Sequence, residues 1–194
     1  VDCGRDSSLD MGTGDFSLSA WIKTTRSDYQ IIVNKGATGA GGKRYSVAMN
    51  SSDVIEANID DNSTSSVFAG STIIYDDSWH HVAVTFDRSG NGQIYLDGKT
   101  DGAAADISSS NSTLDDTGKD FVIGVLADDE TSYNWLGNIA DVRLYDDILT
   151  AAEVQVLASK INIDSALGPG TANLQGWWKL NEGTGTSIAD SSTN

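Results

Sequence analysis

Residues 79–98 read WHHVAVTFDRSGNGQIYLDG, and no other stretch of the chain indicates its fold as clearly. Val82, Val84 and Phe86 recur at every second position, which is the spacing of side chains on one face of a β-strand. Residues 89–92 supply Ser-Gly-Asn-Gly, and Asn-Gly tolerates the positive φ angles of a tight hairpin turn. The stretch therefore predicts a hairpin in which residues 93–97 pair with residues 79–87.

The same alternation recurs along the rest of the chain. Phe16, Leu18, Ala20 and Ile22 alternate with more polar residues, as in a half-buried strand. Further strands are predicted at residues 29–35, 44–50, 54–60, 121–126, 139–145 and 174–181. Many antiparallel strands separated by turns favour two stacked sheets. We therefore expect an all-β fold, a two-sheet antiparallel jelly-roll sandwich.

One short helix is predicted near residues 150–159. Thr150 and Glu153 have the spacing of a capping box, in which each side chain bonds the backbone N–H of the other residue. Val154, Leu157 and Ile161 follow at roughly helical spacing. A single short helix in an all-β chain is expected to cover an edge of the sandwich.

The composition excludes several classes of partner. The chain of 194 residues has 28 acidic and 12 basic residues, giving a formal charge of −16. Such a charge repels the phosphate backbone, so we expect no nucleic-acid partner. No apolar run has the length that spans a membrane, so we expect no membrane insertion. The acidity has two readings, which are solubility in an extracellular setting and cation-binding loops.

Three stretches, taken in order, resemble the laminin-G-like and pentraxin-like branches of the concanavalin A-like lectin/glucanase superfamily. They are residues 14–23 (GDFSLSAWIK), residues 79–98, and residues 136–145 (LGNIADVRLY). The resemblance implies a sandwich domain over residues 1–160. It also implies an extracellular or cell-surface location and a binding role. In that family the His80-His81 pair is a signature of the fold rather than a site.

A fourth stretch is out of its usual order. Residues 176–185 (GWWKLNEGTG) resemble the strand that begins such a domain, but here they follow a predicted linker at 161–173 that contains Pro169. Three explanations stay open for residues 174–194. The chain is a slice through tandem modules, a circular permutant, or a partner in strand exchange between copies.

The resemblance also suggests where calcium could bind. Pentraxin-like proteins carry acidic calcium ligands in the loop that here holds Asp128, Asp129 and Glu130, and Asp60 and Asp61 lie in a second loop expected at the same rim. In related sandwiches a structural cation is held near the positions of Asp141 and Asp190. Calcium requires six to eight oxygen ligands, which Asp, Asn and carbonyl groups supply.

The adjacent residues Trp177 and Trp178 are the predicted ligand-binding residues. Neighbours on a strand point to opposite faces, so we expect one indole to face solvent, a partner sheet edge or a ligand such as a sugar. Core packing is the ordinary alternative for both.

Catalysis is not expected. The superfamily includes glucanases, which use two carboxylates close together on one strand face. Glu56 and Asp60 could share a face but are four residues apart, and the usual acidic motif is absent. The lone Cys3 has no nearby His motif that would make it a nucleophile. We expect a non-enzymatic recognition module that binds carbohydrate or mediates adhesion. The alternatives are a structural or protein-interaction module of a repetitive surface or particle protein without a sugar ligand, and a disfavoured glucanase-like hydrolase.

Overall fold

The computed structural model describes residues 1–37, 42–127, 132–159, 173–183 and 188–192. The strands and helices in these ranges are η1 (Ser7–Leu9), β1 (Phe16–Thr24), β2 (Gln30–Gly36), β3 (Lys43–Met49), β4 (Ile55–Asp61), β5 (Ser65–Ala69), β6 (His80–Phe86), β7 (Asn91–Leu96), β8 (Lys99–Thr100), β9 (Ala105–Asp106), β10 (Phe121–Ile123), β11 (Gly137–Tyr145), α1 (Ala151–Ala158) and β12 (Leu174–Trp178).

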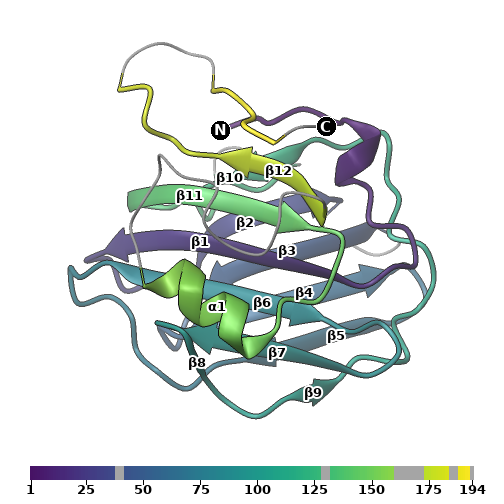
Figure 1. Ribbon diagram of the computed structural model, residues 1–194, viewed down its shortest axis with the longest axis horizontal. Coiled ribbons are helices and arrows are strands. Elements are labelled where there is room, and N and C mark those ends of the chain that lie inside the picture. The colour runs from purple at the N-terminus through teal and green to yellow at the C-terminus, as the bar shows by residue number, and fades with distance from the viewer. Residues whose placement is uncertain (38–41, 128–131, 160–172, 184–187, 193–194) are drawn as a thin grey trace.

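The strands form two antiparallel sheets, which confirms the predicted jelly-roll sandwich. The seven-stranded sheet has the order β12-β11-β1-β6-β7-β8, with β9 also paired to β7. The five-stranded sheet has the order β10-β2-β3-β4-β5. In Figure 1 the seven-stranded sheet faces the viewer with α1 on its outer surface, and the five-stranded sheet lies behind it.

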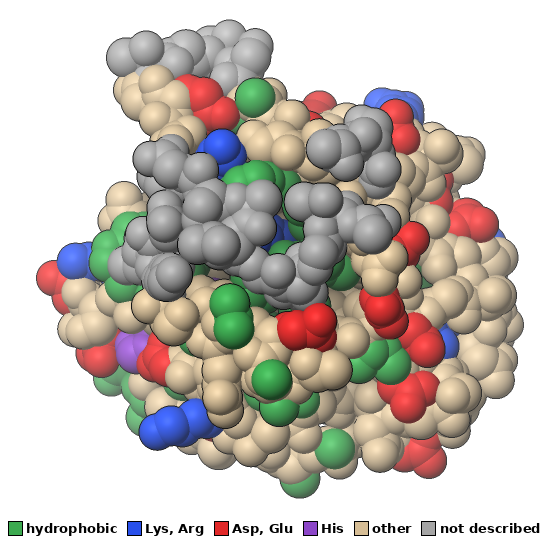
Figure 2. Space-filling model, in the orientation of Figure 1, with side chains coloured by type: hydrophobic (Ala, Val, Ile, Leu, Met, Phe, Trp, Pro, Cys, Tyr) green, Lys and Arg blue, Asp and Glu red, His purple; other side chains and the backbone are tan. Residues whose placement is uncertain are grey.

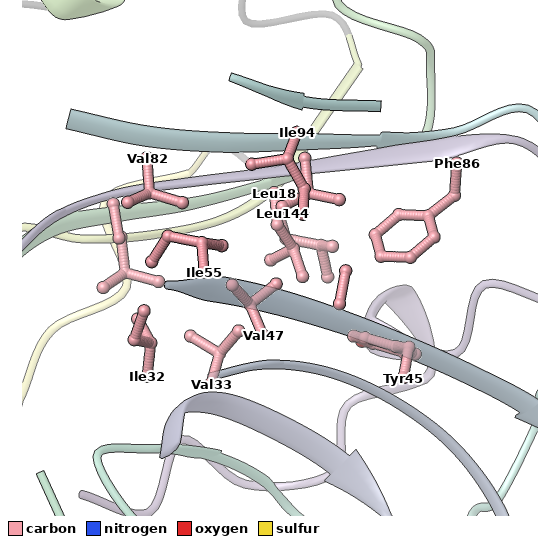
Figure 3. Close-up of a cluster of buried hydrophobic side chains, with 14 of the residues drawn as sticks. Leu18, Ile32, Val33, Tyr45, Val47, Ile55, Val82, Phe86, Ile94 and Leu144 are labelled. Carbon is pink, nitrogen blue, oxygen red and sulfur yellow. The ribbon is translucent and has the colours of Figure 1, made fainter. Parts of the chain in front are cut away.

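The core lies between the two sheets. Leu18, Ile94 and Leu144 extend from the seven-stranded sheet toward Val33 and Val47 of the five-stranded sheet (Figure 3), and all five are buried. Each fully buried aliphatic side chain of this kind contributes about 1.5–3 kcal/mol to folding. The apolar residues that recur at every second position in the sequence therefore form the inward face of each strand.

The hairpin predicted from residues 79–98 is present. β6 pairs with β7 so that Val84 lies opposite Ile94, and Phe86 lies opposite Gly92. A side chain at Gly92 would collide with the ring of Phe68. The glycine therefore serves the packing of β5 against β7 as well as the turn.

The C-terminal strand lies at the edge of the seven-stranded sheet. β12 pairs with β11, placing Trp177 opposite Arg143 and Trp178 opposite Val142. The first residues of the chain extend the other sheet, where Asp2 forms a bridge to Val122 of β10. The N-terminus and residues 188–192 lie on the same side of the molecule in Figure 1. Nearly all of the predicted linker, including Pro169, lies outside the described residues.

The helix α1 begins as the sequence predicts. The Thr150 hydroxyl accepts the N–H of Glu153, and the Glu153 carboxylate accepts the N–H of Thr150, at 3.3 and 2.7 Å. Val154 and Leu157 are buried against the outer surface of the seven-stranded sheet, in a cluster with Ala83 and Tyr145. None of the helices in the described ranges has the length and apolar character needed to cross a membrane.

Candidate functional site

A groove of about 450 Å³ lies on the outer face of the five-stranded sheet. Its floor follows from the alternation of β3 and β4. Tyr45, Val47 and Met49 of β3 and Ile55, Ala57 and Ile59 of β4 all point into the core. Their neighbours in sequence therefore point outward, and Arg44, Ser46, Glu56 and Asn58 line the groove together with Asn34 of β2 and Val67 of β5.

Charged and amide groups on the floor hold one another in place. Arg44 donates from Nε to Asn58 Oδ1 at 2.7 Å and lies 3.7 Å from the Asp60 carboxylate. Glu56 accepts from the Tyr29 hydroxyl at 3.4 Å and from Asn50 Nδ2 at 3.2 Å. Burial and the nearby Glu56 charge raise the pKa of Tyr29 to about 12, so its hydroxyl stays protonated and can donate.

Asn34 offers a hydrogen-bond donor with no partner. Its Oδ1 accepts the backbone N–H of Ala127 at 3.0 Å, which fixes the orientation of the amide because a backbone N–H can only donate. The Nδ2 group therefore points elsewhere, and it has no acceptor among the described residues. The side chain is completely buried and lines the groove. A buried donor without a partner costs about 1–3 kcal/mol, but the Nδ2 atom has almost no accessible surface, so Asn34 lies beneath the floor and out of reach of a ligand in this structure.

Two tyrosines form one wall of the groove. The rings of Tyr29 and Tyr133 meet edge to face, with centroids 5.1 Å apart and planes at 72°. Tyr133 is 52% exposed and has a φ of 58°, a conformation that bulky residues rarely adopt. Its carbonyl accepts the N–H of Ile31 at 2.8 Å, which holds the strained residue against β2. Strain of this kind gathers at functional sites.

The tryptophans predicted to bind ligand are both buried, so the expectation that one of them is exposed is wrong. Trp178 points into the core and stacks on Phe121, with centroids 4.8 Å apart. Trp177 points to the outer surface of the seven-stranded sheet but is only 4% exposed, because it packs with Leu149 and Leu174 in the cluster under α1. A ligand-binding role for the pair is untested, but it no longer has the exposed ring on which it depended.

Trp177 belongs to a buried polar cluster. Its Nε1 donates to Asp141 at 2.6 Å, and Asp141 also pairs with Arg143, whose Nε lies 2.9 Å from its carboxylate. The guanidinium carbon of Arg143 lies 4.6 Å from the centre of the Trp177 ring. Burial lowers the pKa of Arg143, but the hydrogen bond and charge of Asp141 outweigh burial and raise it.

The described members of the predicted calcium set are bound to protein donors. Asp61 accepts the N–H groups of Ser63, Thr64 and Ser112, all at 2.8 Å, and Asp60 lies beside Arg44. Burial raises the pKa of Asp61, but these N–H groups outweigh burial and lower it.

The other predicted cation position is also committed to protein donors. Asp141 is paired with Arg143, and Asp190 accepts the N–H groups of Trp177 and Ser192 at 2.9 and 2.8 Å. Across the described ranges, three or more His, Cys, Asp or Glu residues nowhere gather as metal ligands. Asp128, Asp129 and Glu130 lie outside the described residues, so calcium binding there stays a prediction. Melting curves with and without a chelator would test it.

His80 and His81 point to opposite faces, as expected for neighbours on a strand. His80 bonds Asp97 and Asp76 at 2.9 and 3.2 Å, whereas His81 is buried beside the ring of Trp21. Two side chains on opposite faces cannot hold one ion.

The sequence did not point to the groove itself. The alternation in strands 44–50 and 54–60 did mark Arg44, Glu56 and Asn58 as outward residues, and a row of polar side chains across two paired strands is the signal that could have been used. Asn34 and Tyr133 gave no signal, because they come together only when β2 and a distant loop meet.

Comparison with known proteins agrees with this architecture. A family model described as the concanavalin A-like lectin/glucanases superfamily matches residues 4–155. No curated protein sequence matches the chain.

Among solved structures, a candidate carbohydrate-binding protein from Bacteroides ovatus is similar, with 19% identity and a TM-score of 0.68, over 93% of this chain and 50% of that one. A heptameric pentraxin from Limulus polyphemus has 16% identity and a TM-score of 0.60, over 92% of this chain and 80% of that one. Domains LG4-5 of the mouse laminin α1 chain have 13% identity and a TM-score of 0.59, over 77% and 39%. The chain thus spans half of the Bacteroides protein, and these likenesses show the fold.

Proposed function

This chain belongs to the concanavalin A-like lectin/glucanase superfamily, and we propose that it is a non-enzymatic module that binds carbohydrate in the groove on its five-stranded sheet. We place it in a larger protein at the cell surface or outside the cell. The proposal covers both the class of ligand and the location.

The exposed ring of Tyr133 beside a polar floor carries the proposal. The floor presents Arg44, Glu56 and Asn58, whose polar groups can form hydrogen bonds with sugar hydroxyls. The exposed ring of Tyr133 stands at the wall and offers an apolar surface for the C–H groups of a pyranose. A few fixed polar groups beside aromatic surface are typical of small-ligand sites, whose volumes run from about 300 to 1,000 Å³.

The geometry of the carboxylates favours binding over hydrolysis. Glu56 and Asp60 both point outward from β4, so with a rise of about 3.3 Å per residue their Cα atoms lie about 13 Å apart. In glycosidases the two carboxyl groups themselves lie about 5–9.5 Å apart, so these side chains would have to lean toward each other, whereas the Asp60 carboxylate lies beside Arg44. Glu56 is moreover held by Tyr29 and Asn50. The name of the similar Bacteroides protein, a candidate carbohydrate-binding protein, supports the same ligand class.

A glycan array with the whole chain tests the proposal. We expect binding to at least one class of glycan and a loss of at least about tenfold in affinity for Tyr133→Ala, or about 1.4 kcal/mol. Tyr75→Ala is the matched control, because Tyr75 is 39% exposed but does not line the groove. Equal binding by the two variants would place the ligand elsewhere. The absence of glycan binding would favour the alternative of a structural or protein-interaction module.

A further inference from the structure

A second hollow continues the groove beyond the tyrosine pair. It has a volume of about 410 Å³ and is lined by Arg26, Asp28, Ser132 and Leu136. Tyr29 and Tyr133 line both hollows, so these two residues form the junction between them.

The junction is held rigidly. The Tyr29 hydroxyl donates to the Glu56 carboxylate, and the rings of Tyr29 and Tyr133 meet edge to face with their centroids 5.1 Å apart. The Tyr133 carbonyl is bound to Ile31 N, and Leu136 N is bound to Gln30 Oε1 at 2.7 Å. These hydrogen bonds fix the backbone of Tyr133 and Leu136 to β2, while the side chains of both residues stay half exposed. A preformed wall of this kind lowers the cost of ordering on binding.

Charge is balanced within each hollow. In the first, Arg44 is the cation and Glu56 the anion. In the second, Arg26 pairs with Asp28 at 2.6 Å. Both arginines already have protein partners, since Arg44 bonds Asn58 and lies near Asp60. An acidic sugar would therefore find no unpaired cation among these lining residues, and it would approach a chain with a charge of −16.

From these observations we infer that the two hollows are subsites of one cleft, which holds an uncharged linear oligosaccharide across the Tyr29–Tyr133 pair. This inference rests on the proposed function and narrows it to a ligand class. The polar floor formed by Arg44, Glu56 and Asn58 binds a sugar unit in the first subsite. Leu136 and the Arg26–Asp28 pair contact the next units in the second subsite.

Calorimetric titration of the whole chain with linear glucan, mannan and xylan oligosaccharides of two, four and six sugars tests the inference. We expect one neutral series to bind about tenfold more tightly as four sugars than as two, with little further gain at six. Sialyllactose and oligogalacturonate should bind at least about tenfold more weakly than the best neutral tetrasaccharide at low salt.

Two variants locate the second subsite. Leu136→Ala should weaken tetrasaccharide binding more than disaccharide binding and so shrink the gain with length. Ile73→Ala is the control, since Ile73 is 58% exposed, Leu136 is 51% exposed, and Ile73 lines neither hollow. Melting temperatures of both variants would show that they are folded.

The outcomes separate the two claims. Binding that does not depend on length, a preference for the charged probes, or an unchanged length gain in Leu136→Ala would overturn the inference and leave the proposed function standing. Binding of a peptide library in the cleft without any binding of glycans would overturn both, as would failure to bind any probe.

Discussion

His81 and His80 are neighbours on β6, yet their surroundings shift their pKa values in opposite directions. Burial, with a smaller contribution from the charge of Arg143, lowers the pKa of His81 to about 4 against the opposing effect of Asp97. Partial burial also lowers the pKa of His80, but its hydrogen bonds to Asp97 and Asp76 outweigh burial and raise it. The buried His81 is therefore neutral in the folded protein at neutral pH, whereas His80 is protonated more readily than a free histidine.

This difference gives a pH prediction. Because the folded-state pKa of His81 lies below its unfolded value of 6.5, the unfolded chain binds a proton first as the pH falls, and stability is lost between about pH 6.5 and pH 4. The loss attributable to His81 is about 3 kcal/mol. Urea unfolding of His81→Gln across this range should show a flatter pH dependence than the natural chain.

The neighbouring histidine is the control for that experiment. His80 gains stability from protonation as the pH falls through its raised folded pKa, so His80→Gln should lose stability most at low pH. If the slope of the His81→Gln profile matched that of the natural chain, the assignment of the acid sensitivity to His81 would be wrong.

At the scale of elements, the short strand β12 contributes to both layers of the sandwich. It covers the edge of β11, and Trp178 stacks on Phe121 of the opposite sheet, so the strand joins the two layers. Its neighbour Trp177 supplies the indole N–H that Asp141 accepts in the buried cluster. Loss of the strand would expose an unpaired edge and leave a buried ion pair short of a donor.

We therefore expect deletion of residues 172–194 to lower the melting temperature strongly and to cause aggregation. Truncation of one large buried aromatic side chain alone costs about 3–5 kcal/mol, so Trp178→Ala gives a milder variant for the same comparison. A synthetic peptide of residues 173–192 added to the truncated chain should restore part of the lost stability. An unchanged melting temperature after deletion would show that β12 does not close the sheet in solution.

The sequence predicted most strands because their inward residues alternate without interruption, as in β6 with Val82, Val84 and Phe86. It missed β5, since only Phe68 of that edge strand is buried and its other residues are Ser, Val and Ala. The strand predicted at 121–126 ends at Ile123 in the structure, because Gly124 has a φ of 77° and turns the chain away. Edge strands and glycine turns are where alternation alone fails.

The candidate site could not be predicted in the same way. Its residues come from β2, β3, β4, β5 and three loops, and Tyr29 and Tyr133 are brought together only by the finished sheet. The expectation that Trp177 or Trp178 is exposed was wrong for a related reason: alternation showed correctly that the rings face opposite ways, but it could not show that α1 and its neighbours cover Trp177. The face of the sheet on which a side chain lies follows from the sequence, whereas the elements that cover that face depend on the whole fold.

At the scale of the whole molecule, the charge of −16 acts on stability. Acidic side chains are spread over the face seen in Figure 2 and outnumber the basic ones there. Many exposed carboxylates repel one another at low ionic strength, and this repulsion falls as the Debye length shortens from about 30 Å at 0.01 M salt to about 8 Å at 0.15 M. Folding brings these charges together, so screening should favour the folded state.

We expect the melting temperature to rise by a few degrees when sodium chloride is raised from about 0.01 to about 0.15 M, the shift that about 1 kcal/mol produces in a chain of this size. Asp146→Lys provides the matched test, because Asp146 is exposed and its substitution changes the net charge by two. This variant should melt at a higher temperature in low salt and gain less from added salt. If added salt raised the melting temperature of Asp146→Lys as much as that of the natural chain, repulsion among the surface carboxylates would not set the stability.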